Sequence, residues 1–126
     1  MKVGIKNQIK KTVVEGLTAK VMGSGRLDVF ATPAMVAMME EAAHTSVEAE
    51  LEEGQGTVGT SMTVSHLAAT PVGMEVTCES ELVEVDGRKL VFEIKAMDEA
   101  GLIGEARHER FIIENEKFLA KTNAKL

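Results

Sequence analysis

Three polar side chains stand out because they interrupt apolar segments: Thr32, Glu40 and His66. Glu40 lies in a run of methionines and alanines, where an ionised carboxylate needs a partner or must take up a proton. Thr32 precedes it by eight residues, directly before Pro33, and His66 follows it by twenty-six. A hydroxyl, a carboxylate and an imidazole can together orient, activate and protonate the groups of an acyl-transfer reaction. We therefore take these three as candidate catalytic residues.

Each of the three also has a purely structural interpretation. A threonine directly before Pro33 is a favourable N-cap for a helix. Glu40 can pair with His44, one helical turn further along. His66 can be a solvated or hydrogen-bonded histidine at a strand end. It is the combination, and not any one residue, that favours a site.

The remaining titratable candidates carry less information. His108 stands in a charged segment and is interpreted as a surface or edge-strand residue. The side chains of Glu40, His44, His66 and His108 include ligands for zinc or iron, so a metal site is the rival chemistry. Their spacing matches no known motif, and we expect no metal. Cys78, the only cysteine, is expected to be a small buried thiol.

The elements that must position these residues can be predicted from the hydrophobic pattern. Residues 32–53 are expected to form one helix, and residues 12–22 an extended segment after a basic lead-in at 2–11. From residue 57 a period of two predicts strands at 58–68, 74–85, 90–97 and 102–113. Asp86-Gly87 is a strong hairpin signal, and residues 117–126 are expected to add a last short strand and a basic tail. The pattern predicts an α+β domain in which an antiparallel sheet wraps one long helix.

Composition sets further limits. The chain has 126 residues, of which 44% are hydrophobic and only 3% aromatic, so residues 1–126 suit a single domain with a modest aliphatic core that self-association would support. A net charge of −6 argues against nucleic acid as a partner. No stretch has the length of a membrane span, and the N-terminus lacks the apolar block of a secretory signal. We expect a cytoplasmic protein that does not bind membranes.

The order of these elements, with Thr32-Pro33 at the helix start, resembles the hotdog fold of acyl-CoA thioesterases and dehydratases. The spacing of Thr32, Glu40 and His66 is similar to that of the fluoroacetyl-CoA thioesterase-like branch. The resemblance runs through residues 31–44, 58–67, 70–73 and 108–111 and spans nearly the whole chain. It implies that Gly59 lends a backbone N–H near the thioester carbonyl. It also implies that Arg110 lies where the coenzyme or the sheet edge needs a cation.

The resemblance implies hydrolysis of a small or medium acyl-CoA thioester to the free acid and CoA. Glu40 would attack directly or activate a water, His66 would exchange protons, and Thr32 would orient one of them. No cofactor is expected beyond the CoA of the substrate. One departure concerns the substrate: the fluoroacetyl-specific enzyme has an aromatic lid before the helix, where this chain has Gly23-Ser24-Gly25-Arg26. We therefore carry over thioester hydrolysis without the fluorinated substrate.

Two other functions remain open from the sequence. A non-catalytic acyl-CoA binding or sensing module would use the same fold, and so would a thioester dehydratase or isomerase. Candidate contacts for the phosphates of CoA are cationic side chains on the surface, namely Arg88, Arg110, Lys117 and Lys121.

Geometry limits how the three candidates can meet. Eight helical residues rise about 12 Å, so Thr32 and Glu40 cannot be direct partners on a straight helix. An imidazole from a neighbouring strand or from a second subunit could bridge part of that gap. This agrees with the shared sites that hotdog dimers are expected to form, and we expect a homodimer, with a tetramer as the alternative.

Overall fold

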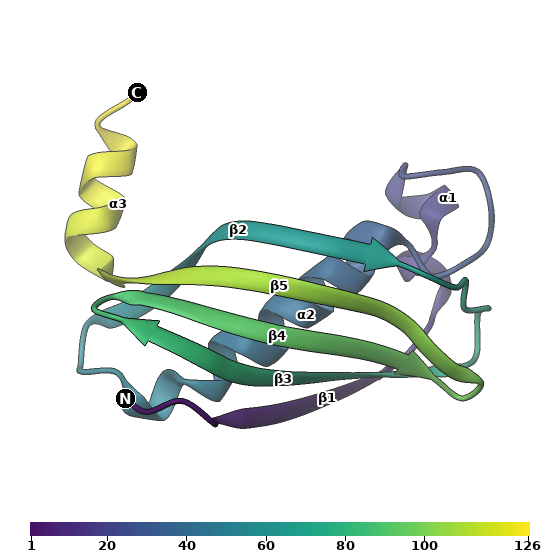
Figure 1. Cartoon of the computed structure of the whole chain (residues 1–126). Coiled ribbons are helices and arrows are strands. Elements are labelled where there is room, and N and C mark those ends of the chain that lie inside the picture. Colours follow the sequence, from purple (N-terminus) through teal and green to yellow (C-terminus); the bar gives the residue numbers. More distant parts are fainter.

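The computed structural model describes residues 1–126 and shows one antiparallel sheet packed against one long helix (Figure 1). The strands are β1 (Lys6–Thr12), β2 (Gln55–His66), β3 (Glu75–Asp86), β4 (Lys89–Asp98) and β5 (Gly101–Glu114). Their order across the sheet is β1-β3-β4-β5-β2, which leaves β1 and β2 at the two edges. The helices are α1 (Ala19–Met22), α2 (Thr32–Ser46) and α3 (Asn115–Asn123), with short 3₁₀ turns at Glu15–Leu17 and Glu48–Glu50.

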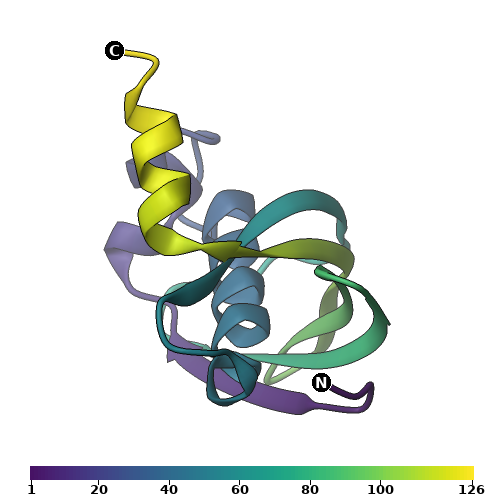
Figure 2. The ribbon, with the colours of Figure 1, turned by 90° about the vertical axis from the view of Figure 1, so that its left-hand side faces the viewer.

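The sheet curls around α2, as the end-on view shows (Figure 2). The buried face of the helix is made of methionine and alanine, namely Ala34, Met35, Met38, Met39, Ala42 and Ala43. Strand side chains alternate between this core and the outer surface, as the β3 residues Val76, Cys78 and Leu82 illustrate. The expected α+β hotdog fold, with its sheet wrapped around a central helix, is confirmed.

The strand meander follows the predicted positions closely. β3 and β4 are joined by a two-residue turn, in which Gly87 has a φ of +60° that favours glycine. Cys78 is fully buried, and burial raises the pKa of its thiol to about 12, so it is the inert core thiol that the sequence predicted.

The first strand lies earlier than expected. Residues 6–12 form β1, although residues 2–11 were predicted to be a basic lead-in without a strand. Residues 12–22, predicted to be extended, contain the 3₁₀ turn and α1. Along β1, Asn7 and Ile9 turn toward the helix while Lys6, Gln8 and Lys10 face outward, so this is an edge strand with a lysine-rich outer face. An edge strand buries few side chains, so residues 6–12 lack the apolar pattern that would have predicted a strand.

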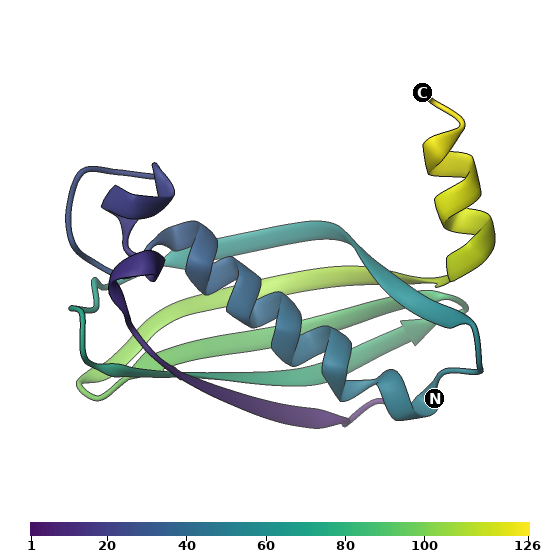
Figure 3. The same cartoon turned by 180° about the vertical axis from the view of Figure 1, so that it is seen from behind.

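The end of α2 and the C-terminus also differ from the prediction. The helix ends at Ser46 and not near residue 53, after the Thr45 and Ser46 hydroxyls bond back to carbonyls of the preceding turn. Residues 115–123 form α3 and not a strand, because this segment is rich in residues with good helix propensity. α3 has no buried residue and projects from the end of the sheet (Figures 1 and 3). No helix in the structure has the length and apolar character needed to cross a membrane.

Candidate active site

Thr32 and His66 meet where α2 begins and β2 ends. Thr32 Oγ1 lies 2.8 Å from His66 Nδ1. The N-cap position is occupied by Ala31, and no side chain caps the helix, so the interpretation of Thr32 as an N-cap is wrong. Because Thr32 is the first residue inside the helix and does not cap it, its hydroxyl can form a hydrogen bond with the imidazole of His66.

The protonation state of His66 follows from its surroundings. Burial lowers the pKa of His66, while the backbone at Ala68 acts in the opposite direction, so the ring is neutral at pH 7. When the Thr32 hydroxyl donates to Nδ1, the ring carries its proton on Nε2. Nε2 is buried and has no hydrogen-bond partner within the chain. The Nε2–H of His66 therefore remains available to donate a hydrogen bond to a group from outside the chain.

Glu40 lies halfway along α2 and faces a cation. Its Oε2 is 3.3 Å from Arg110 Nη1 and 4.0 Å from His108 Nε2, and its side chain is 42% exposed. The predicted pairing with His44 is not formed, because His44 Nδ1 lies 3.3 Å from Glu48 instead. Glu40 is thus a partly accessible carboxylate whose charge is balanced by a buried guanidinium.

Arg110 is inside the protein. It lies on β5, between β4 and β2, so it is not at a sheet edge as one of our expectations held. Its side chain is nearly buried, and Nε and Nη2 donate to the hydroxyl and carbonyl of Thr57 at 2.8 and 2.9 Å. Burial lowers the pKa of Arg110, and the charge of Glu40 opposes this shift. The guanidinium is therefore fixed in orientation and directed at the carboxylate.

Gly59 is the position on β2 next to Glu40. A β-bulge interrupts the pairing of β2 with β5 just after it. A Cβ at this position would lie 2.9 Å from Glu40 Oε2 and 3.2 Å from His108 Cε1. Only glycine lets the carboxylate approach the strand this closely.

His108 is the residue that sequence reasoning missed. It is buried, with 1% of its surface exposed, and not a surface or edge-strand residue. Its ring packs near Phe92, and its two nitrogens contact Ser61 and Arg110. The available signal was the period of two along β5, which places His108 and Arg110 on one face with the apolar Ala106.

The structure brings the candidates together in two groups. Thr32 and His66 form one at the start of α2, and Glu40, Gly59 and Arg110 form the other near its middle. The rise of α2 between Thr32 and Glu40 is about 12 Å. Within the chain, His66 contacts Thr32 but not Glu40, so it does not bridge the two groups.

The rival metal site does not assemble. His44 contacts Glu48 and His66 contacts Thr32, so they do not join Glu40 and His108. No group of three or more His, Cys, Asp or Glu side chains is arranged to hold a metal ion. Of the remaining cations predicted for CoA, Arg88 lies in the β3–β4 turn, and Lys117 and Lys121 lie on α3.

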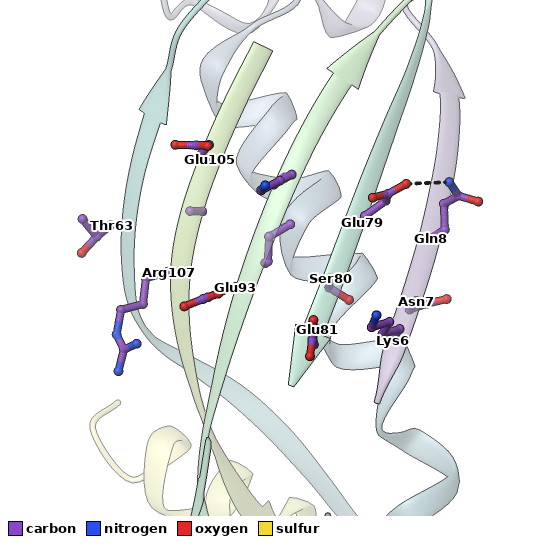
Figure 4. Close-up of a pocket in the computed structure, with 13 residues that line it drawn as sticks. Lys6, Asn7, Gln8, Thr63, Glu79, Ser80, Glu81, Glu93, Glu105 and Arg107 are labelled. Carbon is purple, nitrogen blue, oxygen red and sulfur yellow. Dashed lines mark hydrogen bonds between the residues drawn. The ribbon is translucent and has the colours of Figure 1, made fainter. Parts of the chain in front are cut away.

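A hollow lies on the outer face of the sheet and not at either group (Figure 4). It measures about 1140 Å³, and its lining is mostly charged or polar, with Glu79, Glu93 and Arg107 among the side chains that point outward. Gln8 of β1 donates to Glu79 of the neighbouring strand β3 at 3.1 Å. With few apolar groups to hold an acyl chain, this face is not a candidate acyl site.

Comparison with known proteins shows the family to which the chain belongs. Residues 13–116 match the sequence model of the fluoroacetyl-CoA-specific thioesterase family. The fluoroacetyl-CoA thioesterase of Streptantibioticus cattleyicolor is 45% identical over 98 residues, which cover 78% of this chain and 70% of that protein. The solved structure of the fluoroacetyl-CoA thioesterase FlK superposes with a TM-score of 0.94 at 37% identity, covering 100% of this chain and 98% of that one. A thioesterase superfamily member from Thermus thermophilus superposes with a TM-score of 0.90 at 28% identity, covering 98% and 91%.

The fold and these matches define the class, which is that of the hotdog-fold thioesterases. Within this class, the chain belongs to the fluoroacetyl-CoA-specific thioesterase family. The expectation of an enzyme that hydrolyses acyl-CoA thioesters is thereby confirmed, and the sensing and dehydratase alternatives are not needed.

Proposed function

We propose that the chain hydrolyses small to medium acyl-CoA thioesters with Glu40 as general base. A water deprotonated by Glu40 attacks the carbonyl carbon, the C–S bond breaks, and the proton that Glu40 has taken up passes to the departing CoA thiolate, while the Nε2–H of the neutral His66 donates a hydrogen bond at the reacting centre. The Thr32 hydroxyl orients His66, and the Gly59 N–H stabilises the oxygen that gains charge. The observation that carries this proposal is the 2.8 Å contact of Thr32 with His66, together with the 3.3 Å contact of the Glu40 carboxylate with Arg110.

Direct attack by Glu40 is the second route, and isotope labelling separates the two. Attack by the carboxylate forms an anhydride with Glu40, and water then cleaves it. A single turnover in ¹⁸O-water places the label in the acid product when Glu40 acts as a base, and in Glu40 with an unlabelled acid when water cleaves the anhydride at the Glu40 carbonyl. Label found in Glu40 after repeated turnovers favours the anhydride.

We further propose that the working form is a homodimer joined at β2. β2 is an open edge strand, and His66 Nε2 is buried without a partner in its own chain. Antiparallel pairing of β2 with its copy, centred near Thr63, would set Gly59 of one chain opposite His66 of the other. Thr32 and His66 of one subunit would then face Glu40 of the other. The helical rise of about 12 Å separates Thr32 from Glu40 only within one chain, so it would not keep these residues apart in the dimer.

Substrate choice is proposed more broadly than the family name. The relative from Streptantibioticus cattleyicolor is a fluoroacetyl-CoA thioesterase, and FlK has been solved with acetyl-CoA bound to a variant. In this chain the segment before α2 contains Gly23, Ser24, Gly25 and Arg26, with no aromatic residue among these four. We therefore propose that non-fluorinated short acyl-CoA thioesters are also hydrolysed, without a metal or resident cofactor.

The test is a screen for free thiol release from fluoroacetyl-, acetyl-, propionyl- and longer acyl-CoA esters, with and without a chelator. We expect turnover of at least one short ester that a chelator does not reduce. Inert esters that still bind would contradict hydrolysis. Light scattering during gel filtration should give the mass of a dimer, and a monomer that is active would contradict the shared site.

A further inference from the structure

His108 has both ring nitrogens engaged by partners of fixed character. Nδ1 lies 2.8 Å from the Ser61 carbonyl oxygen, which can only accept a hydrogen bond. Nε2 lies 3.1 Å from Arg110 Nη1, which can only donate. Nδ1 must therefore carry the proton, and Nε2 must be bare. The ring is neutral and held in a single tautomer by its surroundings.

This tautomer determines what Arg110 can do. Nε and Nη2 of Arg110 are bound to Thr57, and Nη1 donates both to His108 and to Glu40. The contact with Glu40 is single and long, at 3.3 Å, whereas an unrestrained guanidinium tends to bind a carboxylate through two short bonds. By taking one hydrogen of Nη1, His108 keeps Arg110 from pairing fully with the carboxylate.

We propose that His108 is a positioning residue of the thioesterase: as the neutral Nδ1–H tautomer it accepts from Arg110 and so leaves part of the Glu40 carboxylate free to act as a base. The inference rests on the proposed function of Glu40. His108 does not touch the reacting atoms in this account. It acts through Arg110, from a site between the bulge of β2 and the ring of Phe92.

Protonation of His108 should disrupt the arrangement. The charged groups that face its ring are Arg110 on β5 and Glu40 on α2, while β2 contributes the Ser61 carbonyl and β4 the Phe92 ring. An imidazolium would place a second donor and a second cation against Arg110 Nη1. Burial and Arg110 both lower the pKa of His108, which favours the neutral ring in the folded protein.

Two variants of the full-length enzyme separate the positioning role from packing. His108→Gln keeps an amide oxygen that can accept from Arg110, whereas His108→Phe keeps a ring beside Phe92 but removes the acceptor. We expect kcat of His108→Gln within about threefold of wild type, and a fall of about tenfold or more for His108→Phe with KM changed by less than about twofold. Equal losses in both variants, or wild-type kcat in His108→Phe, would overturn the proposal.

Nitrogen NMR of histidine-labelled protein gives a readout that does not depend on catalysis or on the fold of a variant. At pH 7 His108 should show a protonated Nδ1 and a bare, hydrogen-bonded Nε2. An Nε2–H tautomer or an imidazolium at pH 7 overturns the inference. If instead the NMR result holds while Glu40→Gln keeps full activity, the proposed function of Glu40 fails and the positioning role fails with it, but the tautomer assignment stands.

Discussion

The two polar groups along α2 differ in how completely their hydrogen-bonding atoms are satisfied. At the middle of the helix, three nitrogens of Arg110 and both ring nitrogens of His108 have partners. At its start, Thr32 and His66 have each other, and His66 Nε2 is buried without a partner. The first group is a completed scaffold around one carboxylate. The second is incomplete within one chain, and the dimer proposed above would supply its missing partner.

The comparison predicts that the largest loss of activity follows removal of the Glu40 carboxylate. Glu40→Gln should lower kcat/KM by about 10²–10⁴-fold, because the amide cannot accept a proton from water. Thiol release under saturating and limiting substrate gives both kinetic constants.

Glu41→Gln is the matched control. Glu41 is the next residue on the helix, but it faces outward and pairs with Lys11 at 3.5 Å. Its loss should change kcat/KM by less than about twofold, since exposed ion pairs contribute little. Equal effects of the two substitutions would remove Glu40 from the mechanism.

Substitution in the Thr32–His66 pair should cause the next largest loss of activity. His66→Ala should lower kcat by about 10²-fold, because it removes the Nε2–H hydrogen-bond donor and the partner of Thr32. His44→Ala, which removes a partly exposed histidine paired with Glu48, should leave kcat nearly unchanged. A His66→Ala enzyme with normal turnover would mean that the Thr32–His66 contact is only structural.

Gly59→Ala tests how closely the two groups depend on backbone access. The new Cβ would meet the end of the flexible Glu40 side chain, which can move away, and the buried His108 ring at 3.2 Å, which has to shift slightly. The fold should therefore survive with a loss of stability of about 1–2 kcal/mol. Displacing Glu40 should nevertheless lower kcat by about tenfold, since small misplacements of catalytic groups are costly. Thermal unfolding and steady-state kinetics on the same sample check both halves. A large fall in stability with normal specific activity would contradict this account of Gly59.

The smallest effect is the dependence of stability on pH. Burial lowers the pKa values of His66 and His108 below their unfolded value of 6.5. Both rings are neutral in either state well above pH 6.5. As the pH falls below 6.5 the unfolded chain binds protons first, so the free energy of unfolding should fall until the folded pKa values are passed. Urea titrations from pH 7.5 to 5 should show this fall, and it should be weaker in His108→Gln. Equal slopes would place His108 outside the pH-sensitive set.

Sequence reasoning succeeded where periodicity decides the structure. The apolar stripe of Met35, Met39 and Ala42 and the alternating strands β3 to β5 each show one clear period. Sequence reasoning failed for polar segments whose structure depends on tertiary contacts and not on an apolar pattern. β1 is a lysine-rich edge strand, and α3 is a helix with no buried residue, so neither carries an apolar pattern to detect.

The candidate site shows the same division. Thr32, Glu40 and His66 were visible because they interrupt apolar segments. His108 was not, since its neighbours Arg107 and Glu109 made it look like a surface residue, although the strand period turns it inward with Arg110. Separation into two groups could be anticipated from the helical rise of about 12 Å, but the contacts that define each group required the structure.

The central claim is that the two groups act on one thioester, each supplied by a different chain. Mixing inactive Glu40→Gln and His66→Ala proteins, with exchange of subunits, tests it directly. In mixed dimers one of the two sites would contain both an intact Glu40 and an intact His66. Random exchange makes half of the dimers mixed, so we predict recovery of about a quarter of wild-type activity for twofold-symmetric dimers. No recovery in samples whose exchange is confirmed by mass spectrometry would contradict the shared site.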